Sequence, residues 1–245
     1  MNESPAVSVV LPAFNEENLI AGTLASLDTF LANRFARYEI IVVDDGSSDR
    51  TAEVVRAWCA GPTAQVHLLV NEGNMGKGYA IRRGVLASQA PVIIFMDADL
   101  PYRLEAIDIF LQALHNGYDL AVGSRVLAGS HVEGVPRLRF IAGQVFSWLV
   151  QALLFRGLPD TQCGFKAFTA RAASEIFPRL TIRGFGFDVE MLYLARKFGF
   201  RIQPVPVQMT ETYRRDSRVR LLRDSLKMFL DLFRVRWNDL RRRYK

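Results

Sequence analysis

The chain has 245 residues, of which 50% are hydrophobic and 23% are charged. This length allows one large domain with a sizeable core, and the composition excludes a disordered chain, a disulfide scaffold and a protein with several membrane spans. The two cysteines, Cys59 and Cys163, are far apart, which predicts no disulfide framework and a reducing compartment. No basic residue precedes the first apolar run, so we expect a strand there, not a signal peptide, in a cytoplasmic protein.

The net charge of +6 is concentrated at the C-terminal end. Residues 213–245 contain 12 Lys and Arg against 4 Asp, a net charge of +8, whereas residues 1–212 contain 19 basic and 21 acidic residues, a net charge of −2. A basic segment of this kind binds anionic surfaces, either nucleic acid or phospholipid headgroups.

Short β-branched runs alternate with helix-length segments in the first half of the chain. The predicted strands are Val7–Leu11, Glu39–Val43, Val66–Val70, Val92–Met96 and Leu120–Val122, and the predicted helices are Glu16–Asn33, Arg50–Ala60, Lys77–Ser88 and Leu104–Asn116. This alternation predicts an α/β fold with a doubly wound, mostly parallel sheet. Since parallel strands end at a common edge, the acidic loops 12–16, 44–49 and 97–99 should meet there.

The second half is less regular. Residues 140–155 are uncharged and flanked by arginines, but they are fewer than the roughly 20 residues of a membrane span, so they form either a buried core helix or a helix at a membrane interface. A strand is predicted at 201–207. An apolar stripe with helical spacing follows, formed by Leu222, Leu226, Phe229, Phe233, Trp237 and Leu240. Arginines cover the other faces, which favours a membrane interface over nucleic acid.

Asp97 and Asp99 are separated by one small residue directly after a predicted strand. Two carboxylates in this position suit Mg²⁺ or Mn²⁺ bound together with substrate phosphates, which points to a nucleoside diphosphate compound. The alternative is a solvated turn without function. The position of the pair beside two other acidic loops favours the metal.

The sequence does not match the motifs of other common nucleotide-binding, metal-binding or catalytic sites. Residues 73–80 lack the first glycine and the Ser/Thr of a P-loop, and they lack the third glycine of a dinucleotide fingerprint. The three histidines show no zinc spacing, and no nucleophile elbow occurs. The glycine-rich turn before the helix at Lys77 either binds a phosphate through its N–H groups or is shaped for packing alone. We assign Lys77 itself to the nucleotide-sugar site.

Several ordered motifs resemble the inverting glycosyltransferases of family 2, which have the GT-A fold. They are VSVVLPAFNEE, VVDDGSSDRT, NEGNMGKGYAIRRG, MDADL and GSR, and they occur in the expected order over residues 7–125. The later DTQCGFKAF and FDVEMLYLA are similar to the polyprenyl-phosphate branch, and most of all to the dolichyl-phosphate glucosyltransferases. The resemblance extends to about residue 210.

The resemblance implies roles for individual residues. The nucleotide-sugar site would comprise Pro12, Phe14, Glu16, Asp44, Asp45 and Asp97, and the metal site Asp97 and Asp99. Phe14 replaces the commoner Tyr, and Pro101 replaces a Gln that contacts the metal in mannosyl relatives. The acceptor phosphate would contact Arg125, Arg214, Arg215 and Arg218, and the alternative for each is an exposed charge.

The implied reaction is in-line attack of a lipid phosphate oxygen on the anomeric carbon of a UDP-sugar, with inversion. A phosphate monoester is mostly dianionic at pH 7, since its second pKa is about 6, so it needs no strong general base. Asp160 or Asp188 would act as the base if the acceptor were a sugar hydroxyl, and Arg125 completes the catalytic candidates. The alternative for Asp188 is a helix N-cap.

We therefore predict a glycosyltransferase domain over 1–212, with a nucleotide-binding half over 1–125 and an acceptor half over 126–212, and a basic amphipathic helical extension over 213–245. The predicted activity is transfer of glucose from UDP-glucose to a polyprenyl phosphate by a protein bound peripherally to the anionic cytoplasmic membrane face. The alternatives are a GDP-mannose donor, a glycan hydroxyl acceptor, and a binding protein without catalysis.

Overall fold

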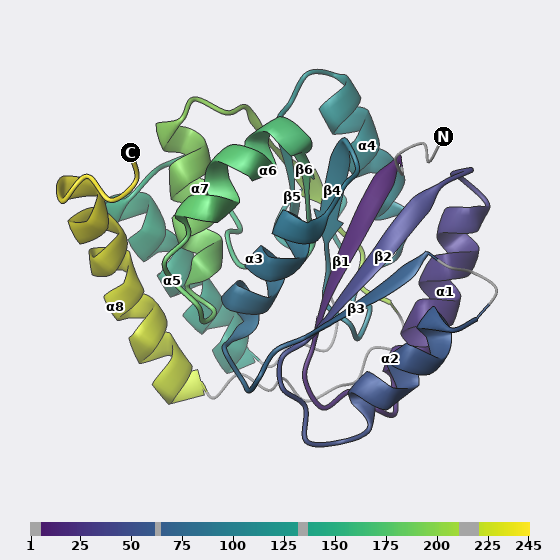
Figure 1. The fold of residues 1–245 in the computed structure, drawn as a ribbon. Helices are drawn as coiled ribbons and strands as arrows, with labels where there is room; N and C mark the ends of the chain where they lie inside the picture. Colours follow the sequence, from purple (N-terminus) through teal and green to yellow (C-terminus); the bar gives the residue numbers. More distant parts are fainter. Residues whose placement is uncertain (1–5, 62–64, 132–136, 211–220) are drawn as a thin grey trace.

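The computed structural model describes residues 6–61, 65–131, 137–210 and 221–245 (Figure 1). In chain order the elements are β1 (Val7–Ala13), α1 (Ile20–Ala32), β2 (Tyr38–Asp44), α2 (Thr51–Cys59), β3 (Val66–Val70), α3 (Lys77–Ala87), β4 (Val92–Phe95), α4 (Ala106–His115), β5 (Leu120–Ser124), α5 (Arg137–Leu153), β6 (Lys166–Thr169), α6 (Ala170–Ile176), η1 (Phe177–Arg179), α7 (Phe187–Lys197), β7 (Ile202–Pro206) and α8 (Leu221–Leu240).

These strands form one sheet in the order β3-β2-β1-β4-β6-β5-β7. β1 pairs in parallel with β2 on one side and with β4 on the other, and β2 pairs in parallel with β3. β5 and β7 are also parallel. The predicted doubly wound, mostly parallel sheet is confirmed.

Helices cover both faces of the sheet. α1, α2 and α4 pack on one face, and α3 and α6 pack on the other. Strand side chains alternate between the two cores: Val9 and Leu11 of β1 face the first, and Val10 faces the second. Because both faces are covered, strand residues on either side must be apolar, which explains the continuous β-branched runs in the sequence.

β6 differs from the prediction of parallel strands. It runs antiparallel to both of its neighbours, β4 and β5, and separates them. Its four residues, KAFT, show no alternation long enough to identify a strand. The antiparallel direction has a consequence for the site, because it pairs Lys166 at the start of β6 with Phe95 at the end of β4, two residues before Asp97.

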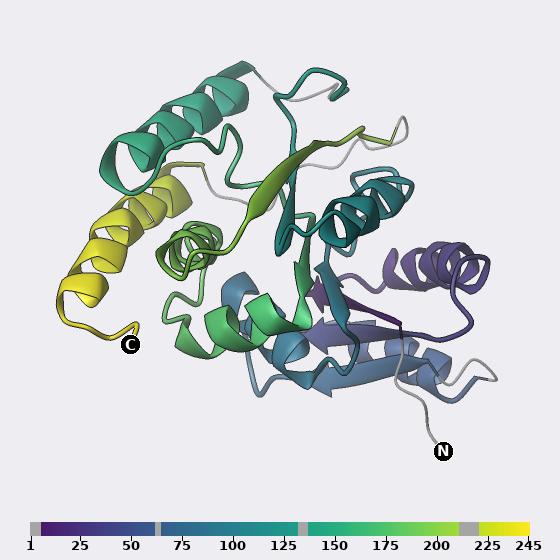
Figure 2. The same ribbon diagram turned by 90° about the horizontal axis from the view of Figure 1, so that it is seen from above.

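α5 and α8 lie side by side at the edge of the molecule away from β3 (Figures 1 and 2). Their inner sides are buried: Val150 of α5 and Leu232 of α8 share a small core with Val189 of α7. Val235 and Tyr244 join the main core on the α3 side of the sheet. α8 is therefore integrated into the fold, and the division of the chain at 212 stays a prediction.

The outer sides of these two helices are apolar and exposed. We call this surface the outer apolar face, and it comprises Ile141, Val145 and Trp148 of α5 and Leu226, Leu230, Phe233, Trp237 and Leu240 of α8. Trp148 is 66% exposed and Leu240 is 79% exposed. The alternative of a fully buried core helix for residues 140–155 is wrong on this side, because α8 covers only part of α5. No described helix is both long and apolar enough to cross a membrane.

Candidate active site

The three acidic loops follow neighbouring strands of the sheet. β1 lies between β2 and β4, so the loops after these strands meet at one edge, as predicted. They form one wall of a cavity of about 1140 Å³. We call this wall the sheet-edge wall; its members are Pro12, Phe14, Glu16, Asp45, Lys77, Asp97 and Asp99.

Hydrogen bonds join the first two loops to each other. The amide of Asn15 donates to Ser47 Oγ at 2.8 Å, and Asn15 Oδ1 accepts from the amide of Ser48 at 2.8 Å. The amide of Glu16 donates to Thr51 Oγ1 at 2.7 Å. Asn15 takes a left-handed conformation (φ +53°), which its side chain tolerates better than most. This wall is thus fixed before any ligand arrives.

Asp44 and Asp45 have different roles in the structure. Asp44 Oδ1 accepts from the amide and the hydroxyl of Ser47, so it shapes the turn after β2. Asp45 reaches the cavity, but its oxygens accept from Asn71 Nδ2 at 2.7 Å and from the amides of Met75 and Gly76 at 2.9 and 2.8 Å. Asp45 therefore organises the glycine-rich turn.

This pairing limits which N–H groups of the glycine-rich turn could bind a phosphate. The amides of Met75 and Gly76 already bind a carboxylate, so they are not available to a phosphate. Gly76 has φ +99°, and a Cβ there would lie 2.5 Å from the carbonyl oxygen of Arg183. Packing therefore contributes to the shape of this turn, and phosphate binding by its other N–H groups stays a prediction.

Asp97 and Asp99 both line the cavity, and Lys77 Nζ lies 2.5 Å from Asp97 Oδ1. Burial would lower the pKa of Lys77, but the charges of Asp97, Asp188 and Asp99 outweigh it and raise that pKa, so the ammonium stays protonated. Leu100, directly after this pair, has φ +44°, an uncommon conformation for a branched side chain. Strain of this kind is typical of functional turns.

The two carboxylates fit a divalent cation. Mg²⁺ is commonly bound by one or two carboxylates together with substrate phosphates, and Asp97 and Asp99 reach one cavity large enough for a nucleotide. Among the described residues, no cluster of three or more metal-ligating side chains occurs. The ammonium of Lys77 beside Asp97 shows that this position accepts positive charge.

The DTQCGFK segment lies directly behind Asp97. A Cβ on Gly164 would lie 2.2 Å from Asp97 Oδ2, so only glycine allows this close approach. The sequence analysis treated Asp97 and residues 160–166 as separate motifs. The antiparallel β6 brings them together.

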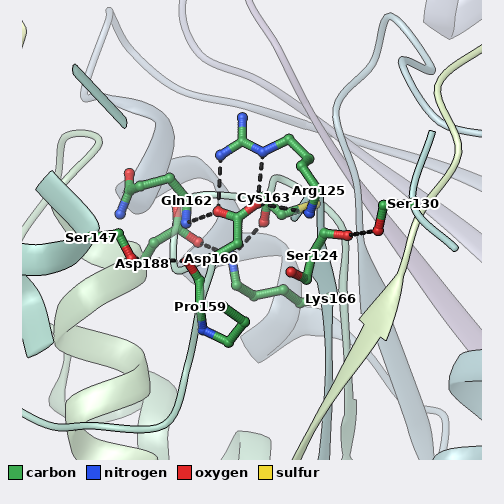
Figure 3. Close-up of polar contacts among 10 residues, drawn as sticks. All are labelled: Ser124, Arg125, Ser130, Ser147, Pro159, Asp160, Gln162, Cys163, Lys166 and Asp188. Carbon is green, nitrogen blue, oxygen red and sulfur yellow. Dashed lines mark hydrogen bonds and ion pairs between the residues drawn. The ribbon is translucent and has the colours of Figure 1, made fainter. Parts of the chain in front are cut away.

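Arg125 is paired with Asp160 (Figure 3). Its Nε and Nη2 donate to the two oxygens of Asp160 at 2.7 and 2.9 Å, and its amide donates at 3.0 Å. Burial would raise the pKa of Asp160, but the guanidinium outweighs it and lowers that pKa. Neither residue is among the described residues lining the cavity. Roles for them in acceptor binding or catalysis stay predictions.

Asp188 is paired with Lys166, which is fully buried. Lys166 Nζ lies 2.5 Å from Asp188 Oδ1 and also donates to the carbonyl of Cys163 (Figure 3). Burial raises the pKa of Asp188, while the charges of Lys166 and Lys77 oppose this rise. The N-cap alternative for Asp188 is wrong, because Gly186 is the N-cap of α7 and no side chain caps that end. A role as general base stays a prediction.

The opposite wall of the cavity was not anticipated. It comprises the loop 181–185 and the inner edge of α8, and we call the α8 part the α8 wall; its members are Asp224, Lys227, Met228, Leu230, Asp231 and Arg234. A signal was present in the sequence, because its charged residues recur at spacings of 3, 4 and 3 beside the apolar stripe. The predicted acceptor residues Arg214, Arg215 and Arg218 lie outside the described residues.

Glu190 of α7 connects the loop to the end of the chain. Its carboxylate accepts from the amides of Thr181 and Ile182 at 2.9 and 2.8 Å and from the hydroxyl of Tyr244 at 2.6 Å. Tyr244 is fully buried. This network fixes the loop and the end of α8 to the same helix, so both parts of the opposite wall have a common support.

Comparisons with known proteins agree with this geometry. The model of glycosyl transferase family 2 matches residues 8–177. The chain is similar to a dolichyl-phosphate beta-glucosyltransferase of Dictyostelium discoideum, with 35% identity over 96% of this chain and 75% of that one, and to its Homo sapiens namesake, with 35% identity over 84% and 67%.

Among solved structures, the fold is similar to that of glucosyl-3-phosphoglycerate synthase from Mycobacterium tuberculosis in complex with Mn²⁺, UDP-glucose and phosphoglyceric acid. The TM-score is 0.69 with 21% identity, and the match covers 98% of this chain and 80% of that one. The same enzyme in complex with Mg²⁺ and UDP gives a TM-score of 0.67 with 20% identity, over 94% of this chain and 78% of that one. The predicted GT-A fold is confirmed.

Proposed function

Because the chain belongs to glycosyl transferase family 2 and is a glycosyltransferase, we propose that it transfers glucose from UDP-glucose to a polyprenyl phosphate of the dolichyl type. The main support is the sheet-edge wall, where Asp97 and Asp99 share one cavity with Phe14, Glu16 and Asp45. Relatives named dolichyl-phosphate beta-glucosyltransferase support the choice of sugar and acceptor.

Most residues of the sheet-edge wall have a task in this reaction. Pro12, Phe14 and Glu16 line the cavity. Pro12 and Phe14 would pack against the nucleoside. Asp97 and Asp99 would hold Mg²⁺ or Mn²⁺, which supplies positive charge to the departing UDP. Lys77, 2.5 Å from Asp97, keeps that carboxylate oriented and adds positive charge near the diphosphate.

The acceptor is its own nucleophile. A phosphate monoester is largely dianionic at pH 7 and can attack the anomeric carbon in line, with inversion and without a general base. Asp160 and Asp188 both form ion pairs, with Arg125 and Lys166. These pairs favour positioning roles for both carboxylates and speak against a sugar hydroxyl acceptor, which requires a free base.

The protein would bind a membrane containing anionic phospholipids at its cytoplasmic face. Its outer apolar face spans two adjacent helices and is bordered by basic side chains such as Arg234 and Arg241 of the α8 region. An apolar face with basic flanks suits the interface plane of such a membrane. The attraction should weaken with salt, since charges near a surface are screened beyond about 10 Å at 0.1 M salt.

The test is nucleotide release. Purified protein with Mg²⁺ or Mn²⁺ is given UDP-glucose or GDP-mannose, each with and without a short polyprenyl phosphate, and released UDP or GDP is measured. We expect UDP release that depends on the lipid. If only GDP is released, from GDP-mannose, the donor sugar is mannose and not glucose. If neither donor releases its nucleotide, the proposed acceptor is wrong.

A further inference from the structure

The α8 wall faces the cavity with a pair of cations. Lys227 and Arg234 both line it, and both side chains are exposed. They are seven residues apart, which places them about two turns, or roughly 10 Å, from each other on one side of the helix. Within the described part of the chain, neither side chain forms a hydrogen bond or an ion pair within 4 Å.

Asp231 lies between them in the sequence and faces the same way. It is half-buried, and a Cβ on Gly186 would lie 2.3 Å from its Oδ2, so Asp231 packs directly on the backbone before α7. The charges of Arg234 and Lys227 both act on its carboxyl group. Asp231 therefore contacts the backbone at Gly186, and the two cations flank it in the sequence.

Leu230 connects the cavity to the outer surface. It lines the cavity and is also 57% exposed as a member of the outer apolar face. Phe233 and Leu226 follow it on that face, one helical turn away on either side. An apolar path thus begins at the mouth of the cavity, beside the two cations.

A lipid phosphate has the same two-part character. Its headgroup is a dianion that binds Lys or Arg side chains, and its hydrocarbon chain packs on an apolar surface. The sheet-edge wall across the cavity is acidic and suits a cation-bridged diphosphate. The α8 wall carries Lys227 and Arg234 together with Asp224 and Asp231, and an apolar face adjoins it.

We infer that Lys227 and Arg234 bind the phosphate of a lipid-phosphate acceptor, and that the first part of its chain leaves the cavity over Leu230 onto the outer apolar face. This inference rests on the proposed function and adds residues to it. It gives α8 two tasks: its outer side contacts the membrane, and its inner edge receives the headgroup.

The experiment compares four variants of the full chain: Lys227→Gln, Arg234→Gln, the double variant, and Arg236→Gln as a control. Arg236 is an exposed arginine of the same helix that does not line the cavity. Each single variant removes one positive charge, so general attraction to an anionic surface changes equally. Rates are measured against farnesyl phosphate in neutral detergent at saturating UDP-glucose, and then against UDP-glucose at saturating acceptor.

We expect the KM for farnesyl phosphate to rise about 10-fold or more in each single variant at the cavity, because a charge-assisted contact is lost. The KM for UDP-glucose and the rate at saturating acceptor should stay within about 2-fold, since the donor uses the other wall. Lys227→Arg should restore most of the affinity. Arg236→Gln should behave as the unchanged protein does.

Three results would overturn the inference: equal effects of Arg236→Gln and the cavity variants, a rise in KM for UDP-glucose in place of farnesyl phosphate, or no change in any variant. Thermal melting of every variant separates a lost contact from a lost fold. If the unchanged protein transfers no glucose to farnesyl phosphate, the proposed function itself fails, which is a different outcome from transfer that ignores Lys227 and Arg234.

Discussion

The sheet-edge wall of the cavity is fixed by hydrogen bonds among its own loops, whereas the α8 wall depends on one helix that is packed on its inner side and bare on its outer side. Asn15, Glu16 and Asp45 all bind backbone or side-chain groups of neighbouring loops. On α8, Lys227 and Arg234 reach the cavity without such partners in the described structure.

This difference matches two kinds of substrate. A nucleotide sugar is small and rigidly recognised, and a preorganised wall suits it because little order must be created on binding. A lipid phosphate arrives from a membrane, and a helix at the boundary between cavity and outer apolar face meets both of its parts. The predictions below test each wall in turn, starting with the largest effect.

Of the variants described here, Lys166→Met should lower the stability of the protein most, because Lys166 lies behind the sheet-edge wall. It leaves the buried Asp188 carboxylate without its partner, which costs about 3–5 kcal/mol. For a chain of this size that corresponds to a fall in Tm of roughly 6–20 °C in a thermal melt. Replacing both partners, Lys166→Met with Asp188→Leu, should recover much of the loss.

The control is Lys197→Met. Lys197 also pairs with an aspartate, Asp239, but this pair is partly exposed and should contribute about 1 kcal/mol or less. Equal losses in the two lysine variants would mean that the buried pair has no special role behind Asp97.

Asp99→Asn should remove activity without removing the fold. Metal-assisted departure of a leaving group contributes several kcal/mol, so we expect kcat to fall at least about 100-fold. Titration with Mn²⁺, followed by its paramagnetic signal, should show weaker binding in the absence of any substrate. Asp108→Asn, at an exposed position on α4, serves as the control, and a matching loss there would contradict the assignment.

Trp148→Glu and Trp237→Glu should weaken binding to vesicles that contain anionic phospholipid. Each removes an exposed aromatic ring from the outer apolar face, and we expect the fraction bound in co-sedimentation to correspond to an affinity about 10-fold lower. Ile109→Glu introduces the same charge at an exposed apolar position on α4. If it weakens binding as much, the outer apolar face is not the docking surface.

Asp231→Asn should give the smallest effect, and its sign depends on pH. Burial raises the pKa of Asp231 to about 6, although Arg234 and Lys227 oppose this. The folded state therefore disfavours the carboxylate, a cost that is absent below pH 4, grows between pH 4 and 6 and is complete above pH 6. The variant should gain about 1 kcal/mol, or roughly 2–4 °C in Tm, at pH 8 and nothing at pH 4, after discounting for partial exposure.

Asp239→Asn should change the stability at pH 8 in the opposite direction to Asp231→Asn. Burial alone would raise the pKa of Asp239, but hydrogen bonds from Lys197 and Tyr193 outweigh it and lower that pKa. Stability from this group is present at neutral pH and lost in acid, so Asp239→Asn should destabilise the protein at pH 8. If both variants shift Tm in the same direction, the environments assigned to these two carboxyl groups are wrong.

The sequence predicted the sheet-edge wall well. Periodicity identified β1 to β5 and β7 to within a few residues, and the acidic loops after β1, β2 and β4 met at one edge as expected. β6 was not predicted, because four residues are too few to show a periodicity. Its antiparallel direction depends on the strands with which it pairs. The ion-pair partners of Asp160 and Asp188 were not predicted either, because tertiary contacts decide these pairs. Lys166 lies 22 residues from Asp188, and Arg125 lies 35 residues from Asp160.

What the sequence by itself determined is the chemistry available at the sheet edge, because parallel strands must end at a common edge and the residues that follow them are then brought together by topology alone. What only the tertiary structure decided is which side of α8 faces the cavity. The helical stripe in residues 222–240 is equally compatible with a core, a partner or a membrane. Packing of Leu232 and Val235 turns the stripe residues Leu226, Phe233, Trp237 and Leu240 outward and brings Lys227 and Arg234 to the cavity. Such contacts depend on shape complementarity between segments far apart in the chain.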